Sequence, residues 1–168
     1  MNCHKTDYMG IWVALLSITA LIVGCTPDDV QPQNNIDKDL LLQLVNSYRS
    51  SGCNCGSEGY FASTTSLVWN NLLESTAHDH SKDMNAKNFF SHEGSNGSNV
   101  GDRLTHRNYF WSICGENIAK GESLTEQKVI EGWINSPGHC KNIMNPAFKE
   151  MGISKEGAYW TQVFGTSR

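Results

Sequence analysis

The sequence predicts an α+β domain in which helices flank a small sheet. Residues 38–51 and 68–88 carry apolar side chains at the i, i+3, i+4, i+7 spacing of amphipathic helices. Near the C-terminus, "FKEMGIS" and "AYWTQVFG" are strand-like runs on either side of Lys155-Glu156-Gly157, a sequence typical of a hairpin turn. Helices that pack around such an antiparallel pair make an α+β fold.

The two N-terminal helices each have one apolar face. The first presents Leu41, Leu44, Val45 and Tyr48. The second presents Trp69, Leu73, Ala77, His80 and Met84. His80 is therefore expected to be a core histidine with a satisfied hydrogen bond rather than a ligand.

The middle of the chain is irregular until a third helix. "GDRL" is expected to begin a short helix, with Arg103 pairing with an acid, and "CGENIAKG" is either a strand or an irregular buried segment. Ser123 and Glu126 have capping-box spacing and predict a helix over 124–135. Ser136-Pro137-Gly138 is expected to end that helix.

The N-terminal segment differs in composition from the rest. Residues 1–24 contain the apolar run "IWVALLSITALIVG", which is short for a bilayer span and typical of a secretory signal. The run ends in "LIVGC", which resembles a bacterial lipobox and predicts that Cys25 is lipidated. A retained signal anchor and a plain cleaved signal are the alternatives. Residues 25–37 are polar with two prolines and predict a flexible linker to a domain over 38–168.

Charge argues against nucleic acid as a partner. The formal net charge of the 168 residues is -4, with acidic and basic residues mixed along the chain. A nucleic-acid-binding surface needs a basic stripe, which the sequence does not contain.

Four cysteines remain after the signal and the lipidation site are set aside: Cys53, Cys55, Cys114 and Cys140. An even number in an exported domain predicts two disulfides. A bond within the C-x-C pair would strain the bridge, so each of its members is expected to bond to Cys114 or Cys140. A four-cysteine zinc site is the less favoured alternative, because the C-x-C spacing is too tight and no C-x-x-C follows.

Several segments occur in an order that resembles one known family. They are "AHDHSKDM", "FFSHEGSNGSNVGDRL", "GENIAKG", "VIEGWINSPGHCKNIMNPAFKEMGIS" and "YWTQVFG". They resemble bacterial members of the family of cysteine-rich secretory proteins, antigen 5 and plant pathogenesis-related proteins, also called the CAP or SCP-like family. The resemblance covers about residues 40–165 and implies an α-β-α sandwich with a small antiparallel sheet between helical layers.

The resemblance also implies a cleft. Many eukaryotic members hold two histidines and two glutamates there, which can bind a divalent metal such as zinc. His92 matches the first histidine and Glu116 the first glutamate, but Ser136 and Tyr159 stand at the other two positions. His139 of "SPGH" could replace a missing ligand, so that His92, His139 and Glu116 converge, with Ser136 and Tyr159 at the cleft edge. A zinc ion held there would keep an open position for water.

His139 has a simpler alternative role. A histidine that follows a helix end can hydrogen-bond the last carbonyls and favour the helix dipole. In that interpretation His139 and Glu116 only brace the backbone.

The functional expectation is a binding module rather than an enzyme, because no nucleophile is visible and the ligand set is altered. The chain is expected to be exported and anchored by lipid at Cys25 in the cell envelope, on the periplasmic face or outer surface. It would bind a lipid, glycan or peptide in the His/Glu cleft, with or without metal. The alternatives are a metal-dependent hydrolase of envelope or host polymers with Glu116 as base, and a scaffold without a small ligand.

Overall fold

The computed structural model describes residues 36–168. The helices and strands in chain order are α1 (Lys38–Ser51), β1 (Cys53–Asn54), the 3₁₀ turn η2 (Gly56–Glu58), β2 (Tyr60–Phe61), β3 (Val68–Trp69), α2 (Asn71–Lys87), α3 (Val100–His106), β4 (Trp111–Lys120), α4 (Glu126–Ile134), α5 (Pro137–Met144), β5 (Glu150–Glu156) and β6 (Tyr159–Ser167). This mixture of helices and strands confirms the α+β prediction.

The main sheet has the strand order β3-β5-β6-β4. β5 and β6 form the expected hairpin, whose turn includes Gly157 with a positive φ of 57°. β4 covers the "CGENIAKG" segment and pairs antiparallel with β6 along its whole length. The short β3 adds to β5 in parallel, so the sheet is antiparallel except at this edge.

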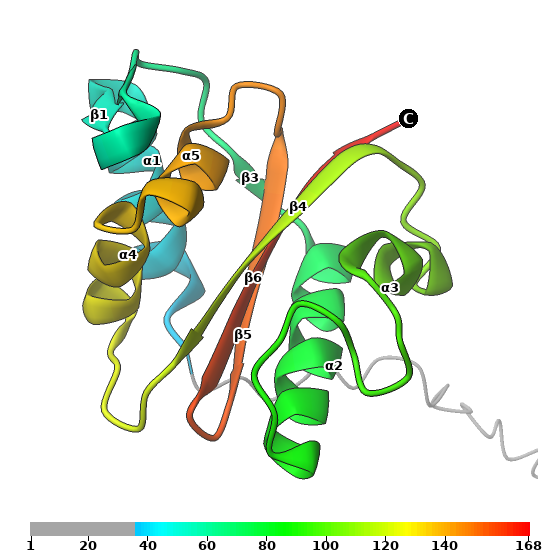
Figure 1. The fold of residues 1–168 in the computed structure, drawn as a ribbon. Helices are drawn as coiled ribbons and strands as arrows, with labels where there is room; N and C mark the ends of the chain where they lie inside the picture. The colour runs from blue at the N-terminus through cyan, green and yellow to red at the C-terminus, as the bar shows by residue number, and fades with distance from the viewer. Residues whose placement is uncertain (1–35) are drawn as a thin grey trace, which may run out of the picture. The chain divides into compact units, whose positions relative to one another are not determined.

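Helices cover both faces of the sheet. α1, α4 and α5 lie on one face and α2 and α3 on the other (Figure 1). The larger core, which includes Trp133, Trp160 and Phe164, lies under the first group. Smaller clusters lie under α2 and α3. This is the α-β-α sandwich that the resemblance implies.

Alternation along β4 assigns its side chains to these two layers. Cys114 and Ile118 pack in the clusters under α2 and α3, whereas Ile113 and Ala119 pack in the core on the opposite face. Glu116 has the same parity as Cys114 and therefore faces α2 and α3. β4 is an edge strand, so groups from both layers can approach each other around it.

The first two helices begin at polar caps. α1 spans the expected residues, and the Asp37 side chain accepts a hydrogen bond from the backbone N–H of Leu40 at 3.0 Å. α2 begins later than periodicity predicts, because Asn70 caps it and the preceding residues Val68 and Trp69 pair with β5. Strand pairing, which involves distant residues, overrides the local helical pattern there.

The segment around Ser136-Pro137-Gly138 differs from the prediction in one respect. α4 ends at Ile134 as expected, although Thr125 rather than Ser123 caps its start. Pro137 then occupies the first turn of a new helix, α5, where its missing N–H leaves no bond unmade. His139 therefore lies in the first turn of α5 and not at the C-terminus of α4, so the role of a helix-end brace for α4 is wrong.

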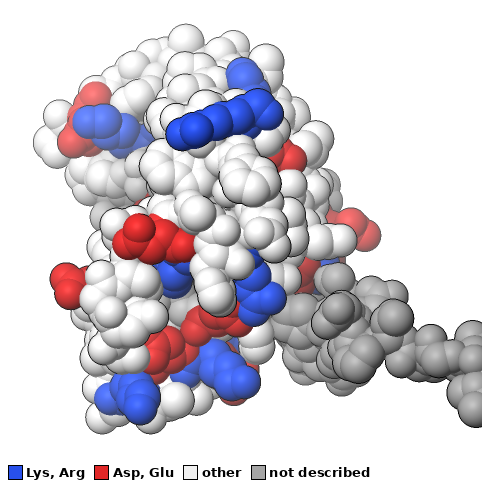
Figure 2. All heavy atoms as spheres, turned by 90° about the vertical axis from the view of Figure 1, so that its right-hand side faces the viewer, with Lys and Arg blue, Asp and Glu red and all other residues white. Residues whose placement is uncertain are grey.

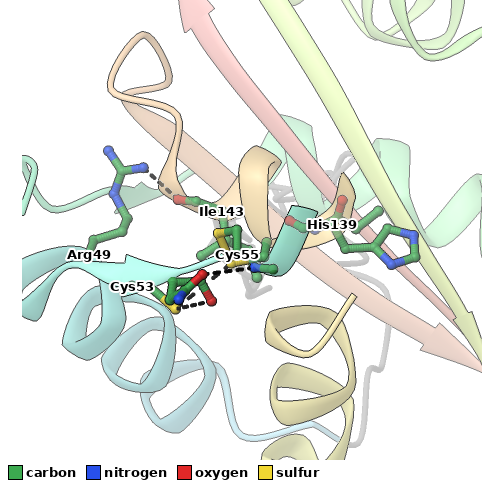
Figure 3. The surroundings of a disulfide bond; sticks show 9 residues. Arg49, Cys53, Cys55, His139 and Ile143 are labelled. Atoms are coloured by element: carbon green, nitrogen blue, oxygen red, sulfur yellow. Dashed lines mark hydrogen bonds between the residues drawn. A yellow bond between two sulfur atoms is a disulfide. The ribbon is translucent and has the colours of Figure 1, made fainter. Parts of the chain in front are cut away.

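A buried arginine ties α1 to the end of α5. Arg49 is 0% exposed, and its guanidinium donates to the carbonyls of Thr65 at 2.8 Å, Ile143 at 2.6 Å and Asn145 at 2.9 Å. Figure 3 shows the bond to Ile143. Burial lowers the pKa of Arg49 to about 10. Carbonyls that the helix end leaves unpaired are satisfied in this way.

One of the two expected disulfides is present. Cys55 bonds to Cys140, which joins the loop after α1 to α5. The second expected bond is wrong, since Cys53 and Cys114 are free thiols. Cys53 packs in the core under α1, α4 and α5, and Cys114 packs under α2 and α3, so the sheet separates them.

The predicted signal (1–24), the lipidation site Cys25 and nearly all of the linker (25–37) lie outside the described residues. Within residues 36–168, no helix is long and apolar enough to cross a membrane.

Candidate functional site

Glu116 is at the centre of a charged cluster between β4 and the α2–α3 layer. Its side chain is 3% exposed. The Arg103 guanidinium donates to Oε2 at 2.6 Å, and His92 Nδ1 lies 2.8 Å from Oε1. His80 Nε2 is 3.8 Å from the same Oε1. The carboxylate thus has a partner at both oxygens, and Arg103 has the acidic partner that the sequence predicts.

Arg103 also fixes the loop that carries His92. Its Nη1 donates to the carbonyl of Ser98 at 2.8 Å, and both Nη atoms donate to the carbonyl of His92 at 3.2 Å. α3 presents Arg103 toward this loop because Asn99 and Asp102 form a capping box at the start of the helix. Arg103 therefore holds the glycine- and serine-rich loop at His92 and Ser98, and Asp83 holds it at Ser95, whose N–H and Oγ donate to the carboxylate at 2.8 and 2.6 Å.

The hydrogen bonds define which ring nitrogens carry protons. A carboxylate only accepts, so His92 Nδ1 carries the proton of this hydrogen bond. The His92 side chain is 57% exposed, which leaves Nε2 accessible to a ligand. His80 Nε2 lies 2.9 Å from the carbonyl of Ser91 and must donate there, while its Nδ1 has no partner among the described residues.

A hollow of about 550 Å³ opens beside this cluster; we call it the His92 hollow. It is lined by His92, Glu93, Gly97, Asn99, Val100 and Glu116. A second hollow of about 410 Å³ has His80, Arg103 and several acidic residues in its wall. Residues of the Glu116 cluster therefore line both hollows. Figure 2 shows acidic and basic side chains mixed on the α2–α3 side, without a continuous basic stripe.

His139 approaches the cluster from the other layer. Burial lowers the pKa of His139, and the charge of the neighbouring His92 lowers it further. The peptide around His139 is held by β4, since Asn117 Nδ2 donates to the His139 carbonyl at 3.2 Å. Asn142 of α5 likewise donates to the Glu116 carbonyl at 3.1 Å. The ring points away from the disulfide beside it (Figure 3).

Ser136 and Tyr159 have structural contacts and line neither hollow. Ser136 is the N-cap residue of α5, and its side chain makes no capping bond. Tyr159 is 3% exposed, its hydroxyl donates to Asn88 at 3.2 Å, and Lys120 Nζ lies 4.5 Å from its ring centroid. Of the predicted cleft residues, the structure thus places His92 in contact with Glu116 and His139 near them, whereas Ser136 and Tyr159 lie outside the hollows.

Sequence reasoning missed the role of His80. Helical periodicity placed it correctly on the buried face, where it is 0% exposed. Burial lowers its pKa, and the Glu116 charge opposes that shift. A buried histidine needs polar partners, and this requirement was the available signal, but only the fold shows that Glu116 is one of them.

The residues do not fit a preformed zinc centre in the cleft. Within residues 36–168, the one group of three or more side chains with metal-ligand spacing is Cys53, Cys55 and Cys140, and two of these are joined in a disulfide. His92, His139 and Glu116 do not form such a group. The Arg103 guanidinium also forms an ion pair with Glu116, the carboxylate that would have to bind the ion. No metal-dependent step follows from this arrangement.

Comparison with known proteins identifies the family. The model of the cysteine-rich secretory protein family, the CAP domain, matches residues 42–164. This match covers most of the chain, which therefore belongs to that family, as its motifs indicate.

Individual relatives agree with this assignment. The uncharacterized protein YkwD of Bacillus subtilis is 38% identical over 94 residues, which are 55% of this chain and 36% of the relative. The uncharacterized membrane protein YlbC of the same organism is 34% identical over 98 residues, 58% of this chain and 28% of the relative. The chain thus spans about a third of the length of these relatives.

Solved structures share the fold. An extracellular protein containing an SCP domain from Bacillus anthracis has a TM-score of 0.70 at 30% identity, covering 86% of this chain and 45% of that one. An outer surface protein from Borrelia burgdorferi has a TM-score of 0.64 at 16% identity, covering 77% of this chain and 92% of that one. The second likeness is one of fold alone.

Proposed function

We propose that this chain is an exported binding protein of the bacterial envelope that holds a polar ligand in the His92 hollow without turning it over. The observation that carries the proposal is the state of Glu116. Both of its oxygens are engaged, one by Arg103 at 2.6 Å and one by His92 at 2.8 Å. A carboxylate held in this way orients its neighbours and is poorly placed to accept a proton from water.

The walls of the hollow suit a ligand that has both hydrogen-bonding groups and apolar surface. The lining combines the polar side chains of His92, Glu93 and Asn99 with Val100, and apolar atoms make up more of its surface than polar atoms. A glycan or a peptide, which carries donors and acceptors beside apolar faces, suits such walls better than a lipid chain, which would leave the polar side chains without partners. His92 Nε2 is available to hydrogen-bond such a ligand, because Nδ1 is engaged by Glu116 and the side chain is exposed.

Binding is tested by calorimetric titration of the full chain with soluble peptidoglycan fragments, which carry both sugars and peptides. We expect His92→Ala to weaken binding at least tenfold, and His92→Gln to restore part of it. The control is Lys128→Ala, since Lys128 is an exposed residue of α4 in the opposite layer, and this variant should bind like the wild type. Absent binding, or equal binding by His92→Ala, would refute the proposal.

A hydrolase is the second candidate, because one contact favours it. His92 is oriented by a carboxylate and exposes its other nitrogen, which is the arrangement of a general base. Within residues 36–168, however, neither His92 nor His139 hydrogen-bonds a hydroxyl or thiol that could serve as nucleophile. Release of soluble fragments from labelled cell wall, abolished by His92→Ala, would favour the enzyme over the binder.

Location in the envelope rests on the N-terminal sequence and on the relatives. Two similar structures are an extracellular protein and an outer surface protein. We propose that Cys25, outside the described residues, carries the lipid that anchors this chain. Labelling with a palmitate analogue should be lost in Cys25→Ala, and persistent labelling would show that the lipobox interpretation is wrong. A scaffold without small ligand would tolerate every change in the His92 hollow.

A further inference from the structure

Three sulfur atoms meet where the loop after α1 contacts α5. Cys55 and Cys140 form the disulfide, and Cys53 Sγ lies 3.8 Å from Cys140 Sγ. The ligand atoms of all three residues lie within 4.8 Å of one another. Figure 3 shows Cys53 beside the bonded pair. A free thiol in contact with a disulfide is the arrangement from which thiol–disulfide exchange proceeds.

We propose that these three cysteines form a thiol–disulfide exchange site in which Cys53 displaces Cys55 from Cys140. Cys53 loses its proton to solvent, and its thiolate attacks Cys140 Sγ. The Cys53–Cys140 bond forms while the Cys55–Cys140 bond breaks. The electron pair leaves with Cys55 Sγ, which takes up a proton. One disulfide and one thiol exist before and after the step, so neither an oxidant nor a reductant is needed.

The surroundings of the sulfurs favour this direction of attack. Cys53 is half-buried and reachable by solvent bases, whereas Cys55 is 1% exposed and Cys140 is 0% exposed. Burial raises the pKa of the Cys53 thiol, so the thiolate is scarce near neutral pH. Exchange should therefore accelerate as the pH rises.

Exchange would alter how α5 is held. The loop meets this helix through the disulfide, through the Lys141–Glu58 ion pair at 2.8 Å and at Gly56, which lies close to Pro137. Moving the bond from Cys55 to Cys53 shifts the covalent tether by two residues along the loop. The shifted tether ends at Cys140, next to His139, so the exchange site is adjacent to the turn that carries this histidine.

The test is to locate the free thiol in the oxidised full chain. The chain is incubated at several pH values, quenched with acid, alkylated with N-ethylmaleimide and digested with trypsin. Cys53 and Cys55 fall in the peptide 50–82, Cys140 in 129–141 and Cys114 in 108–120. Fragmentation of the linked peptides then shows which cysteine of the first peptide carries the label.

We expect label on Cys53 and, in a smaller share that is reached faster at higher pH, on Cys55. Cys55→Ser should form the Cys53–Cys140 bond, and Cys53→Ser should keep the Cys55–Cys140 bond with no label in peptide 50–82. Cys114→Ser, on the other side of the sheet, should leave the distribution unchanged. Circular dichroism establishes that each variant is folded.

Three results would overturn the inference. Label confined to Cys53 at every pH would show that exchange does not occur. A free Cys140 in folded Cys55→Ser would show that Cys53 cannot reach it. A bond between Cys53 and Cys55, with Cys140 labelled, would show that Cys140 is not the shared sulfur.

Discussion

The buried pair of Arg103 and Glu116 allows a quantitative prediction about stability. Arg103→Met removes the guanidinium and leaves the Glu116 carboxylate, 3% exposed, with His92 as its one close donor. Breaking a buried ion pair from one side costs about 3–5 kcal/mol. Because His92 still donates at 2.8 Å, we expect a loss near the lower end, about 3 kcal/mol. The melting temperature should fall by about 10 °C.

The opposite change should be milder. In Glu116→Gln the arginine keeps the carbonyls of Ser98 at 2.8 Å and His92 at 3.2 Å, so we expect a loss of about 1–2 kcal/mol. The double variant should lose less than the sum of the two single variants, by about 1–3 kcal/mol. His92→Ala, on the exposed side of the cluster, should cost at most about 1 kcal/mol.

Urea unfolding at pH 7, followed by tryptophan fluorescence, measures each of these free energies. The reasoning is refuted if Arg103→Met costs no more than His92→Ala, because the pair would then be solvated. It is also refuted if the two single losses simply add, since the two side chains would then not interact.

Three further predictions concern other parts of the domain. Burial lowers the pKa of both His80 and His139, so the unfolded chain takes up protons before the folded chain does as the pH falls below about 6.5. The free energy of unfolding should therefore be highest above that pH and decline below it. Urea unfolding at pH 7.5 and pH 5 should show a smaller decline for His139→Gln than for the wild type. A Cβ at Gly152 would lie 2.1 Å from the backbone nitrogen of Glu74, so Gly152→Ala should lower the free energy of unfolding by at least about 3 kcal/mol, as measured by thermal unfolding. A Cβ at Gly132 of α4 would meet no atom within 4 Å, so the control Gly132→Ala should gain up to about 1 kcal/mol. A small loss in Gly152→Ala would show that α2 and β5 separate easily. In Arg49→Lys, the lysine ammonium cannot reproduce the planar guanidinium that donates to the carbonyls of Thr65, Ile143 and Asn145. The variant should lose about 3 kcal/mol in denaturant unfolding. An unchanged unfolding midpoint would show that these hydrogen bonds do not stabilise the fold.

The sequence predicts the elements that local interactions define and fails for those that depend on residues far apart in the chain. α1 was predictable at both ends because its apolar period and its Asp37 cap are local. The β5–β6 hairpin was predictable because its turn lies between adjacent strands. The start of α2 was placed too early, at 68 instead of Asn71, because Val68 and Trp69 form β3, which exists only through pairing with a strand some 80 residues later.

The candidate site divides in the same way. The motifs marked His92 and Glu116 individually and gave Arg103 an acidic partner of unknown identity. Three features depend on the packing of the whole domain. The acidic partner of Arg103 is Glu116, His80 faces the same carboxylate, and His139 belongs to a separate helix. Spacing along the chain carries no information about which side of a sheet a loop returns to.

The cysteines show the limit most clearly. Their even number and export predicted disulfides, and Cys55–Cys140 is one of the pairings expected. Sequence alone therefore determined the family, the order of most elements and the residue types available for chemistry. Only the tertiary structure decided that Cys53 and Cys114 lie on opposite faces of the sheet, and that the thiol of Cys53 lies against the disulfide instead. The physical reason is that alternation along a strand sets the face of each side chain, but the register and layer that join distant segments are decided by the packing of the whole domain.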